Sequence, residues 1–211
     1  MSRSSDNFRR NIYAHRGLWA SEAEKNSIKA IELALKEGFA VETDLRSYNS
    51  KIVISHDSPD ENSPHFFDIA DWETGRFALN IKEDGLFTKF EDYRDCLVNS
   101  ESFFFDGSFP DMYHFARRKL PFALRRSDLE LEIAMKSEYV WLDSFNSDWW
   151  DETDILKLIQ DGYKVVVVSP ELHGRDPQEI WRTFKNLLLD GVNVGICTDF
   201  PRELLGQLAN V

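Results

Sequence analysis

The chain has 211 residues, of which 42% are hydrophobic, so it can bury one large core and we expect a single domain. Acidic residues outnumber basic ones 37 to 25, and the formal net charge of -12 argues against nucleic acid as the main partner. No run approaches the roughly 18 consecutive apolar residues that cross a bilayer, which argues against a transmembrane segment.

The cysteine content and the start of the chain indicate a cellular location. Cys96 and Cys197 lie far apart in the sequence, and no leader with a basic start and an apolar core precedes the first β-type run. We therefore expect a cytoplasmic protein. The sequence predicts no particular oligomeric state.

After a polar lead-in, short β-type runs alternate with stretches of helical period. Residues 1–10 show no periodicity and are predicted to be a loose lead-in, so the predicted domain covers residues 11–211. Eight runs are predicted to be strands: 12–15, 40–45, 77–82, 102–106, 121–124, 139–143, 164–169 and 193–198. A further short strand, 51–55, follows a predicted turn and brings His56 back toward the end of the second strand.

Four segments between the strands are predicted to be helices: 27–36, 151–160, 177–189 and 201–208. In the first of them an apolar stripe is marked by Ile28, Ile31, Leu33 and Leu35. Asn26 is suitable as the N-cap, and Gly38 ends the helix. The last two carry proline at or near the first turn, where the missing N–H costs little.

Strands that alternate with helices are typical of an α/β fold with a parallel sheet. A doubly wound open sheet would show the same alternation, but eight strands favour a closed TIM (β/α)8 barrel. At 211 residues the barrel would be compact, because this fold usually takes about 250 residues.

Polar side chains recur where the predicted strands end, and in a parallel barrel these ends form a single rim that carries the active site. Glu42 and Asp44 are two residues apart on one strand, so both side chains point the same way. Two adjacent carboxylates suit a hard cation such as Mg²⁺ or Ca²⁺. The alternative is that both are rim acids paired with Lys82 or Arg16.

Two histidines accompany these acids. His15 and His56 could act in opposite roles, one accepting a proton from an attacking hydroxyl and the other donating a proton to the leaving oxygen. Arg16 and Lys82 could neutralise phosphate oxygens, or they could be paired with Glu42 and Asp44.

Six motifs in this order resemble the glycerophosphodiester phosphodiesterase family, part of a wider group of phospholipase-C-like phosphodiesterases built on this barrel. They are His15-Arg16-Gly17, Asn26-Ser27, Glu42-x-Asp44, His56-Asp57, Ile81-Lys82 and Thr198-Asp199-Phe200-Pro201. The resemblance is strong over residues 11–57, returns at 77–82 and 193–201, and is faint across the middle of the chain.

The resemblance implies metal-assisted hydrolysis of a small glycerophosphodiester. His15 and His56 would be the general acid and base, and Glu42 and Asp44 would bind Mg²⁺ or Ca²⁺. Arg16 and Lys82 would hold the phosphate. The neighbouring glycerol hydroxyl of the substrate would attack first, giving a cyclic phosphate that water then opens.

Three positions depart from the family pattern. Asn80 stands where the family has a glutamate, so an amide oxygen would replace the third anionic metal ligand and weaken cation binding. Lys25 replaces the acid of the family's Glu-Asn-Thr motif.

The third departure is the loop after the seventh strand, residues 169–175, where Glu171 and Arg175 could grip a substrate head group or belong to an ordinary turn. The change at Asn80 also leaves a second function open. The barrel could bind phosphate esters without turning them over.

Overall fold

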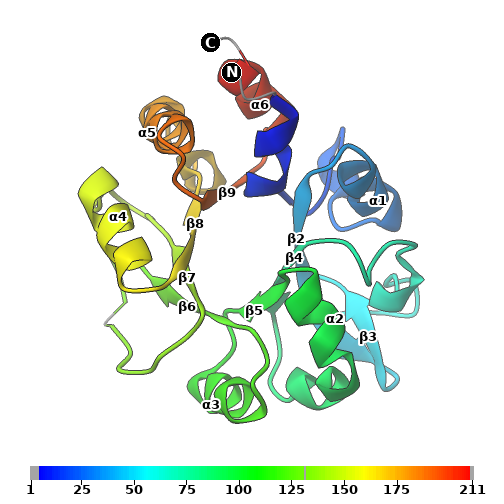
Figure 1. The fold of residues 1–211 in the computed structure, drawn as a ribbon. Coiled ribbons are helices and arrows are strands. Elements are labelled where there is room, and N and C mark those ends of the chain that lie inside the picture. Colours follow the sequence, from blue (N-terminus) through cyan, green and yellow to red (C-terminus); the bar gives the residue numbers. More distant parts are fainter. Residues whose placement is uncertain (1–4, 131, 210–211) are drawn as a thin grey trace.

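The eight predicted runs form parallel strands that curl into a barrel with helices around it (Figure 1). The strands are β1 (Ile12–His15), β2 (Ala40–Tyr48), β4 (Phe77–Ile81), β5 (Phe103–Phe105), β6 (Ala123–Arg126), β7 (Tyr139–Leu142), β8 (Lys164–Val168) and β9 (Val194–Thr198). In this computed structural model, which describes residues 5–130 and 132–209, they lie in the order β5-β4-β2-β1-β9-β8-β7-β6. The predicted TIM barrel is confirmed.

The barrel closes at a short seam between β5 and β6. The two strands meet at one isolated parallel bridge between Phe104 and Phe122, and the Phe104 amide donates to the Pro121 carbonyl at 3.0 Å. The predicted returning strand is confirmed as β3 (Lys51–Ile54), which pairs antiparallel with β2 and places Ile54 opposite Leu45.

The four predicted helices are confirmed as α1 (Ile28–Lys36), α4 (Glu152–Gln160), α5 (Gln178–Leu189) and α6 (Pro201–Ala209). Two more were not predicted, α2 (Arg94–Asn99) and α3 (Phe109–Arg118). Residues 127–138 join β6 to β7 without a helix, leaving aside residue 131, which lies outside the described part of the chain.

Short 3-10 helices complete the connections: η1 (Ser5–Asn11), η2 (Glu22–Glu24), η3 (Phe66–Asp68), η4 (Leu86–Lys89), η5 (Glu91–Tyr93) and η6 (Pro170–His173). The first of these lies where the sequence predicts a loose lead-in. It contacts α6, and Phe8 within it is buried in the core. Residues 1–4 lie outside the described residues.

The N-cap of α1 differs from the sequence prediction. Ser27 is the cap, because its Oγ accepts a hydrogen bond from the Ala30 amide at 3.2 Å. Asn26, the predicted cap, has a φ of 61° and its side chain reaches β2 instead. Asparagine tolerates this left-handed conformation better than most residues. Asn26 can therefore turn the chain while its side-chain amide binds Asp44 on β2.

Successive side chains of each strand point to opposite sides of the sheet, so the buried apolar residues form two separate regions. One set of positions packs between the strands and the helices, with Val41 and Leu45 on β2 as examples. The other set fills the barrel interior: Tyr13, Ala40, Ala78, Phe103, Phe105, Ala123, Tyr139, Trp141, Val166, Val168 and Cys197.

Aromatic rings fill the β5–β7 side of the interior. Phe103 stacks on Tyr139 with ring centroids 4.2 Å apart, and Phe105 stacks on Trp141 at 4.1 Å. The neighbouring inward positions on β2 and β4 carry alanine instead, at Ala40 and Ala78. The interior is therefore packed with side chains and is not a pore.

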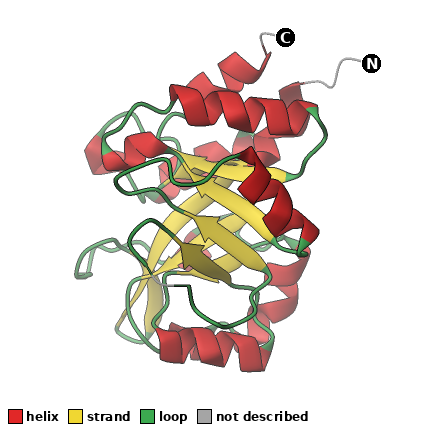
Figure 2. Ribbon diagram, turned by 90° about the vertical axis from the view of Figure 1, so that its left-hand side faces the viewer, coloured by secondary structure: helices red, strands yellow, loops and turns green. Residues whose placement is uncertain are grey.

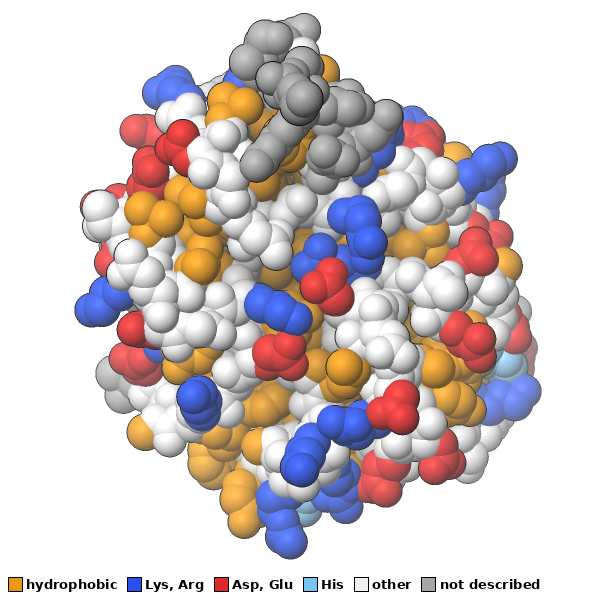
Figure 3. All heavy atoms as spheres, in the orientation of Figure 1, with side chains coloured by type: hydrophobic (Ala, Val, Ile, Leu, Met, Phe, Trp, Pro, Cys, Tyr) orange, Lys and Arg blue, Asp and Glu red, His pale blue; other side chains and the backbone are white. Residues whose placement is uncertain are grey.

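The strands run away from the viewer in Figure 1, and the side view in Figure 2 shows their arrowheads at the opposite end of the barrel. At the amino ends, Glu101 lies within 4 Å of Arg10, Arg76 and Lys164, and Lys164 also pairs with Glu138. Figure 3 shows basic and acidic side chains mixed around the centre of this face. In such barrels this end serves stability, and the opposite rim carries the chemistry.

Within the described residues, no helix is both long and apolar enough to cross a membrane.

We expect Phe103→Ala to lower the free energy of unfolding by about 3–5 kcal/mol, because it leaves a cavity in the packed interior. Urea denaturation measures this change. Phe109→Ala makes the same chemical change at a side chain that is 57% exposed, and should shift stability far less. Equal losses in the two variants would contradict the packing described for the interior.

Candidate active site

The inward positions become polar at the carboxyl ends of β1, β2 and β4. His15 ends β1 and pairs in register with Glu42 on β2, while Asp44, two residues further, pairs with Asn80 on β4. Because three adjacent strands supply them, these four side chains meet at one end of the barrel. The structure thus brings together four residues that the sequence places in the site.

Asp44 is fully buried, and three neighbouring side chains stabilise its negative charge. The Nε of Arg16 lies 3.0 Å from Oδ2 and the Nζ of Lys82 lies 3.2 Å from Oδ1. The side-chain amide of Asn26 donates to Oδ2 at 2.8 Å. Burial opposes ionisation, but Lys82, Arg16 and Asn26 outweigh it and lower the pKa of Asp44 below its ordinary value.

A tight turn after β1 places Arg16 over Asp44. Arg16 has a φ of 59°, its amide donates to the Glu42 carbonyl at 2.9 Å, and its own carbonyl accepts from the Asn26 amide at 3.0 Å. Gly17 follows with a φ of 90°, and a Cβ there would lie 2.6 Å from the Ala30 carbonyl carbon. Only glycine fits, since any side chain would collide with the start of α1.

Glu42 is also buried, but far fewer cationic or hydrogen-bonding groups surround its carboxylate. Its Oε2 lies 3.8 Å from the Nε2 of His15 and has no hydrogen-bond partner among the described residues. Burial, followed by the charge of Asp44, raises the pKa of Glu42 from 4.5 to about 7. This carboxyl group therefore titrates in the neutral range and favours a nearby positive charge.

His15 is oriented by Asp199, which lies just past β9. The Nδ1 of His15 is 2.6 Å from Oδ1 of Asp199, so the carboxylate favours a proton on Nδ1 and leaves Nε2 facing Glu42. Burial opposes ionisation of Asp199, but the hydrogen bond and charge of His15, with Lys25, lower the pKa of Asp199 below its ordinary value. The sequence analysis gave Asp199 no role beyond a strand-end motif, and only the fold joins it to His15.

His56 follows β3 and is held by its backbone. Arg46 donates to the His56 carbonyl from Nε at 3.1 Å and from Nη2 at 3.0 Å, and its Nη1 donates to the Lys82 carbonyl at 2.8 Å. The Nδ1 of His56 lies 2.9 Å from Oδ1 of Asp57. Arg46, which the sequence analysis did not single out, thus ties His56 to the strand end that carries Lys82.

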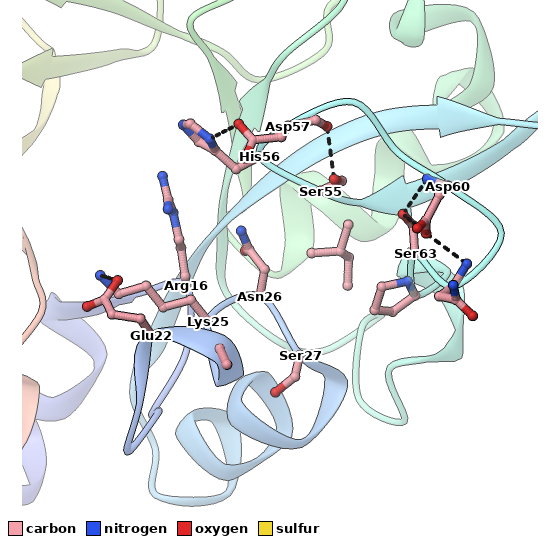
Figure 4. Close-up of a pocket in the computed structure, with 14 residues that line it drawn as sticks. Arg16, Glu22, Lys25, Asn26, Ser27, Ser55, His56, Asp57, Asp60 and Ser63 are labelled. Carbon is pink, nitrogen blue, oxygen red and sulfur yellow. Dashed lines mark hydrogen bonds and ion pairs between the residues drawn. The ribbon is translucent and has the colours of Figure 1, made fainter.

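A pocket of about 420 Å³ lies beside His56 and Arg16, between the α1 side of the rim and the loop after β3 (Figure 4). Arg16 and Lys25 line it from one side, and Asp57 and Asp60 line it from the other. Asn26, Ser27, Ser55, Asn62 and Ser63 contribute further polar groups, and the described residues that line the pocket include no Phe, Tyr or Trp. Such a pocket suits a small polar molecule that carries an anionic group toward Arg16.

The oxygen atoms at the ends of β2 and β4 suit a hard cation. Oε2 of Glu42 and Oδ1 of Asn80 are buried and have no hydrogen-bond partner among the described residues. Oδ1 of Asp44 accepts no hydrogen bond there either, but it is ion-paired with the Nζ of Lys82 at 3.2 Å. Carboxylate and amide oxygens are what Mg²⁺ and Ca²⁺ prefer. With Asn80 in the set there are only two acids, and the described residues contain no group of three or more His, Cys, Asp or Glu side chains placed to hold a metal ion.

The loop after β8 makes contacts within the protein. Glu171 accepts hydrogen bonds from Ser169, Thr198 and the Asp199 amide, the last at 3.1 Å. Arg175 donates to Asp148 at 2.8 Å and to the Ser144 carbonyl at 2.6 Å. A substrate-binding role for Glu171 and Arg175 stays a prediction, but in the structure Glu171 supports the segment that carries Asp199.

A second polar network occupies the other side of the rim, and it joins strand-end residues whose mutual contacts the sequence did not predict. Arg125 on β6 bonds Asp106 at 2.9 Å and lies 3.6 Å from Asp143, which in turn lies 2.7 Å from the Nε2 of His173. Asp106 follows β5, Arg125 lies on β6, and Asp143 and His173 follow β7 and β8. The network therefore connects the strand ends on both sides of the short seam.

Comparison with solved structures shows the same fold in two other proteins. A candidate glycerophosphodiester phosphodiesterase from Galdieria sulphuraria matches with a TM-score of 0.69 and 16% identity, over 95% of this chain and 98% of that one. The glycerophosphodiester phosphodiesterase from Agrobacterium tumefaciens matches with a TM-score of 0.63 and 13% identity, over 95% of this chain and 99% of that one. The sequence matches no protein-family profile and no curated protein. At these identities the likeness establishes a shared fold over almost the whole chain.

We expect the stability of the metal-free protein to fall as pH rises from about 4.5 to about 7 because of Glu42. Its pKa is raised on folding, so the folded state binds the proton more tightly and loses that advantage as the carboxyl ionises. The effect is on the order of 3 kcal/mol. Urea denaturation with chelator at several pH values should show Glu42→Gln gaining stability relative to the wild type across this range, whereas parallel curves would contradict the assignment.

Proposed function

We propose that the chain is a divergent member of the glycerophosphodiester phosphodiesterase family and hydrolyses a small glycerophosphodiester with the help of Mg²⁺ or Ca²⁺. One observation carries the proposal. Among the described residues, the buried Oε2 of Glu42 and Oδ1 of Asn80 lack hydrogen-bond partners, and Oε2 of Glu42 lies 3.8 Å from a histidine, His15, that a carboxylate orients. The shared fold with two proteins described as such phosphodiesterases supports it.

Arg16 and Lys82 would receive the phosphate. Both already lie against Asp44, from opposite oxygens, so their positions are set before substrate arrives. The guanidinium of Arg16 also lines the pocket, where it can offer its remaining donors to phosphate oxygens.

His15 and His56 would move the protons. In the first step one imidazole accepts the proton of the glycerol hydroxyl next to the phosphate, and a new P–O bond forms. The bond from phosphorus to the leaving alcohol breaks, and the other histidine donates a proton to that oxygen. Water then opens the cyclic phosphate with the two roles reversed. Asp199 and Asp57 hold Nδ1 of their respective partners, which leaves both Nε2 atoms for these transfers.

Glu42, Asp44 and Asn80 would hold the cation. When bound, it would withdraw charge from the phosphoryl oxygens and favour ionisation of the attacking hydroxyl. The raised pKa of Glu42 fits this role, because a buried carboxylate without a full set of partners gains most from a cation.

The pocket beside His56 and Arg16 would take the alcohol part of the substrate. Its lining of serine, asparagine and aspartate favours hydroxyl groups. A quaternary ammonium group is disfavoured, since the described residues of the lining include no Phe, Tyr or Trp ring that could face it.

A second candidate function is a barrel that binds phosphate esters without turnover. The amide of Asn80 and the two cations paired with Asp44 favour it, because both reduce the negative charge available to a cation.

We expect the purified protein to hydrolyse glycerophosphodiesters or bis-p-nitrophenyl phosphate when Mg²⁺, Ca²⁺ or Mn²⁺ is present, and chelator to abolish turnover. His15→Ala should lose about 10²- to 10⁴-fold in rate, as expected for loss of acid or base help. His114→Ala, on α3 outside the barrel, is the matched control and should keep its rate. Binding of phosphate esters without turnover under any condition would favour the second function.

We expect Asn80→Glu to tighten Mg²⁺ or Ca²⁺ binding by at least about tenfold, which corresponds to about 1.4 kcal/mol. The variant adds a third carboxylate beside Glu42 and Asp44. Isothermal titration calorimetry measures the affinity, and Asn99→Glu, an exposed position on α2, controls for the added charge. An affinity unchanged by Asn80→Glu would exclude Asn80 as a ligand of the ion.

A further inference from the structure

A closed ring of four contacts starts and ends at His15. The Trp19 indole Nε1 donates to the His15 carbonyl at 3.0 Å, and the Nζ of Lys25 lies 4.3 Å from the centre of the Trp19 ring. Lys25 then donates to Oδ2 of Asp199 at 3.5 Å, and Oδ1 of the same carboxylate lies 2.6 Å from the Nδ1 of His15. Both ends of His15, its backbone and its ring, are therefore held by one connected set of side chains.

No proposed step uses Lys25 or Trp19, and Lys25 is the one of these two that carries a charge. Its side chain is only 13% exposed although it carries a full charge, and Asp199 is similarly sheltered at 16%. Its other ion-pair partner, Glu22, is 79% exposed, so solvent screens that contact more strongly. The contact that gains most from the location of Lys25 is therefore the one with Asp199.

Asp199 is fixed from two further sides. Its amide donates to Glu171 at 3.1 Å, which sets the backbone, and His15 occupies one carboxylate oxygen. Lys25 binds the second carboxylate oxygen of Asp199, and this contact fixes the rotation of the carboxylate group about its Cβ–Cγ bond. Without that partner the carboxylate can rotate or turn toward solvent, and His15 loses the fixed acceptor that selects its tautomer.

We propose that Lys25 is a positioning residue for His15: it holds Asp199 so that the imidazole keeps its proton on Nδ1 and presents Nε2 to the reacting centre, with Trp19 as the support beneath the ammonium group. This inference rests on the proposed function for its kinetic consequences. It requires no contact between Lys25 and the substrate, although Lys25 also lines the pocket.

Steady-state kinetics separates positioning from substrate binding. If Lys25 acts through Asp199, Lys25→Gln lowers kcat by about 10- to 100-fold, the size typical of an outer-shell partner, while KM changes by less than about twofold. Lys25→Arg restores most of the rate. Lys29→Gln, at an exposed position on α1, is the matched control and should leave both constants unchanged.

A double-mutant cycle tests the route of the effect. Lys25→Gln combined with Asp199→Asn should be no slower than Asp199→Asn alone, because both changes break the same support of His15. Full additivity of the two losses would show that Lys25 acts elsewhere. A raised KM with unchanged kcat would show instead that Lys25 binds substrate, and would overturn the proposal.

A measurement without turnover keeps the two proposals distinguishable. The ¹⁵N shifts of the His15 ring at one fixed pH report which nitrogen carries the proton, and Lys25→Gln should mix the tautomers while Lys25→Arg keeps them as in the wild type. Wild-type protein that turns nothing over but shows this change would overturn the proposed function alone. An unchanged His15 spectrum in Lys25→Gln would overturn the role of Lys25.

Discussion

A buried carboxylate costs several kcal/mol unless cations and donors surround it, and Asp44 meets that requirement with groups from three separate segments. Arg16 comes from the turn after β1, Asn26 from the start of α1, and Lys82 from the end of β4. Each of these segments carries a further part of the site. The same turn follows His15, and the Arg46 side chain joins the Lys82 carbonyl to that of His56. Satisfying one internal charge therefore also fixes the turn that follows His15 and the strand end that Arg46 ties to His56.

The two acids of β2 respond differently to the same burial. Asp44 has two cations and an amide around it and stays ionised, whereas Glu42 has mainly His15 nearby and has its pKa raised to about 7. This difference leaves one carboxylate to hold the cationic side chains and another that favours an added cation. In the proposed function, the amide at Asn80 would limit how strongly such a cation is bound, so this one position would set the balance between turnover and simple ester binding.

A second polar network joins the strand ends on both sides of the seam. Arg125, Asp106, Asp143 and His173 form a network across the ends of β5 through β8, where the barrel closes with a single bridge between Phe104 and Phe122. These side-chain contacts join strand ends at a place where β5 and β6 share few backbone hydrogen bonds. Glu171 and Arg175 contact the Asp199 segment and the loop after β7, so the loop that follows β8 supports the residue that orients His15.

Local periodicity was enough to predict the eight strands, four of the helices and the returning strand. The apolar residues recur every two positions in a strand and about every 3.6 positions in a helix, so their spacing alone distinguishes the two. The same alternation showed that Glu42 and Asp44 share one side of β2. It could not predict that Asn26 contacts Asp44 or that Asp199 contacts His15. The first pair is 18 positions apart in the sequence and the second is 184. It also missed α2 and α3, in the middle of the chain where the family resemblance is faint. The sequence by itself determined which side chains reach the carboxyl rim. Only the closed barrel decided which of them meet, because strand register and the return of β9 to β1 set those distances, and neither is encoded in local spacing.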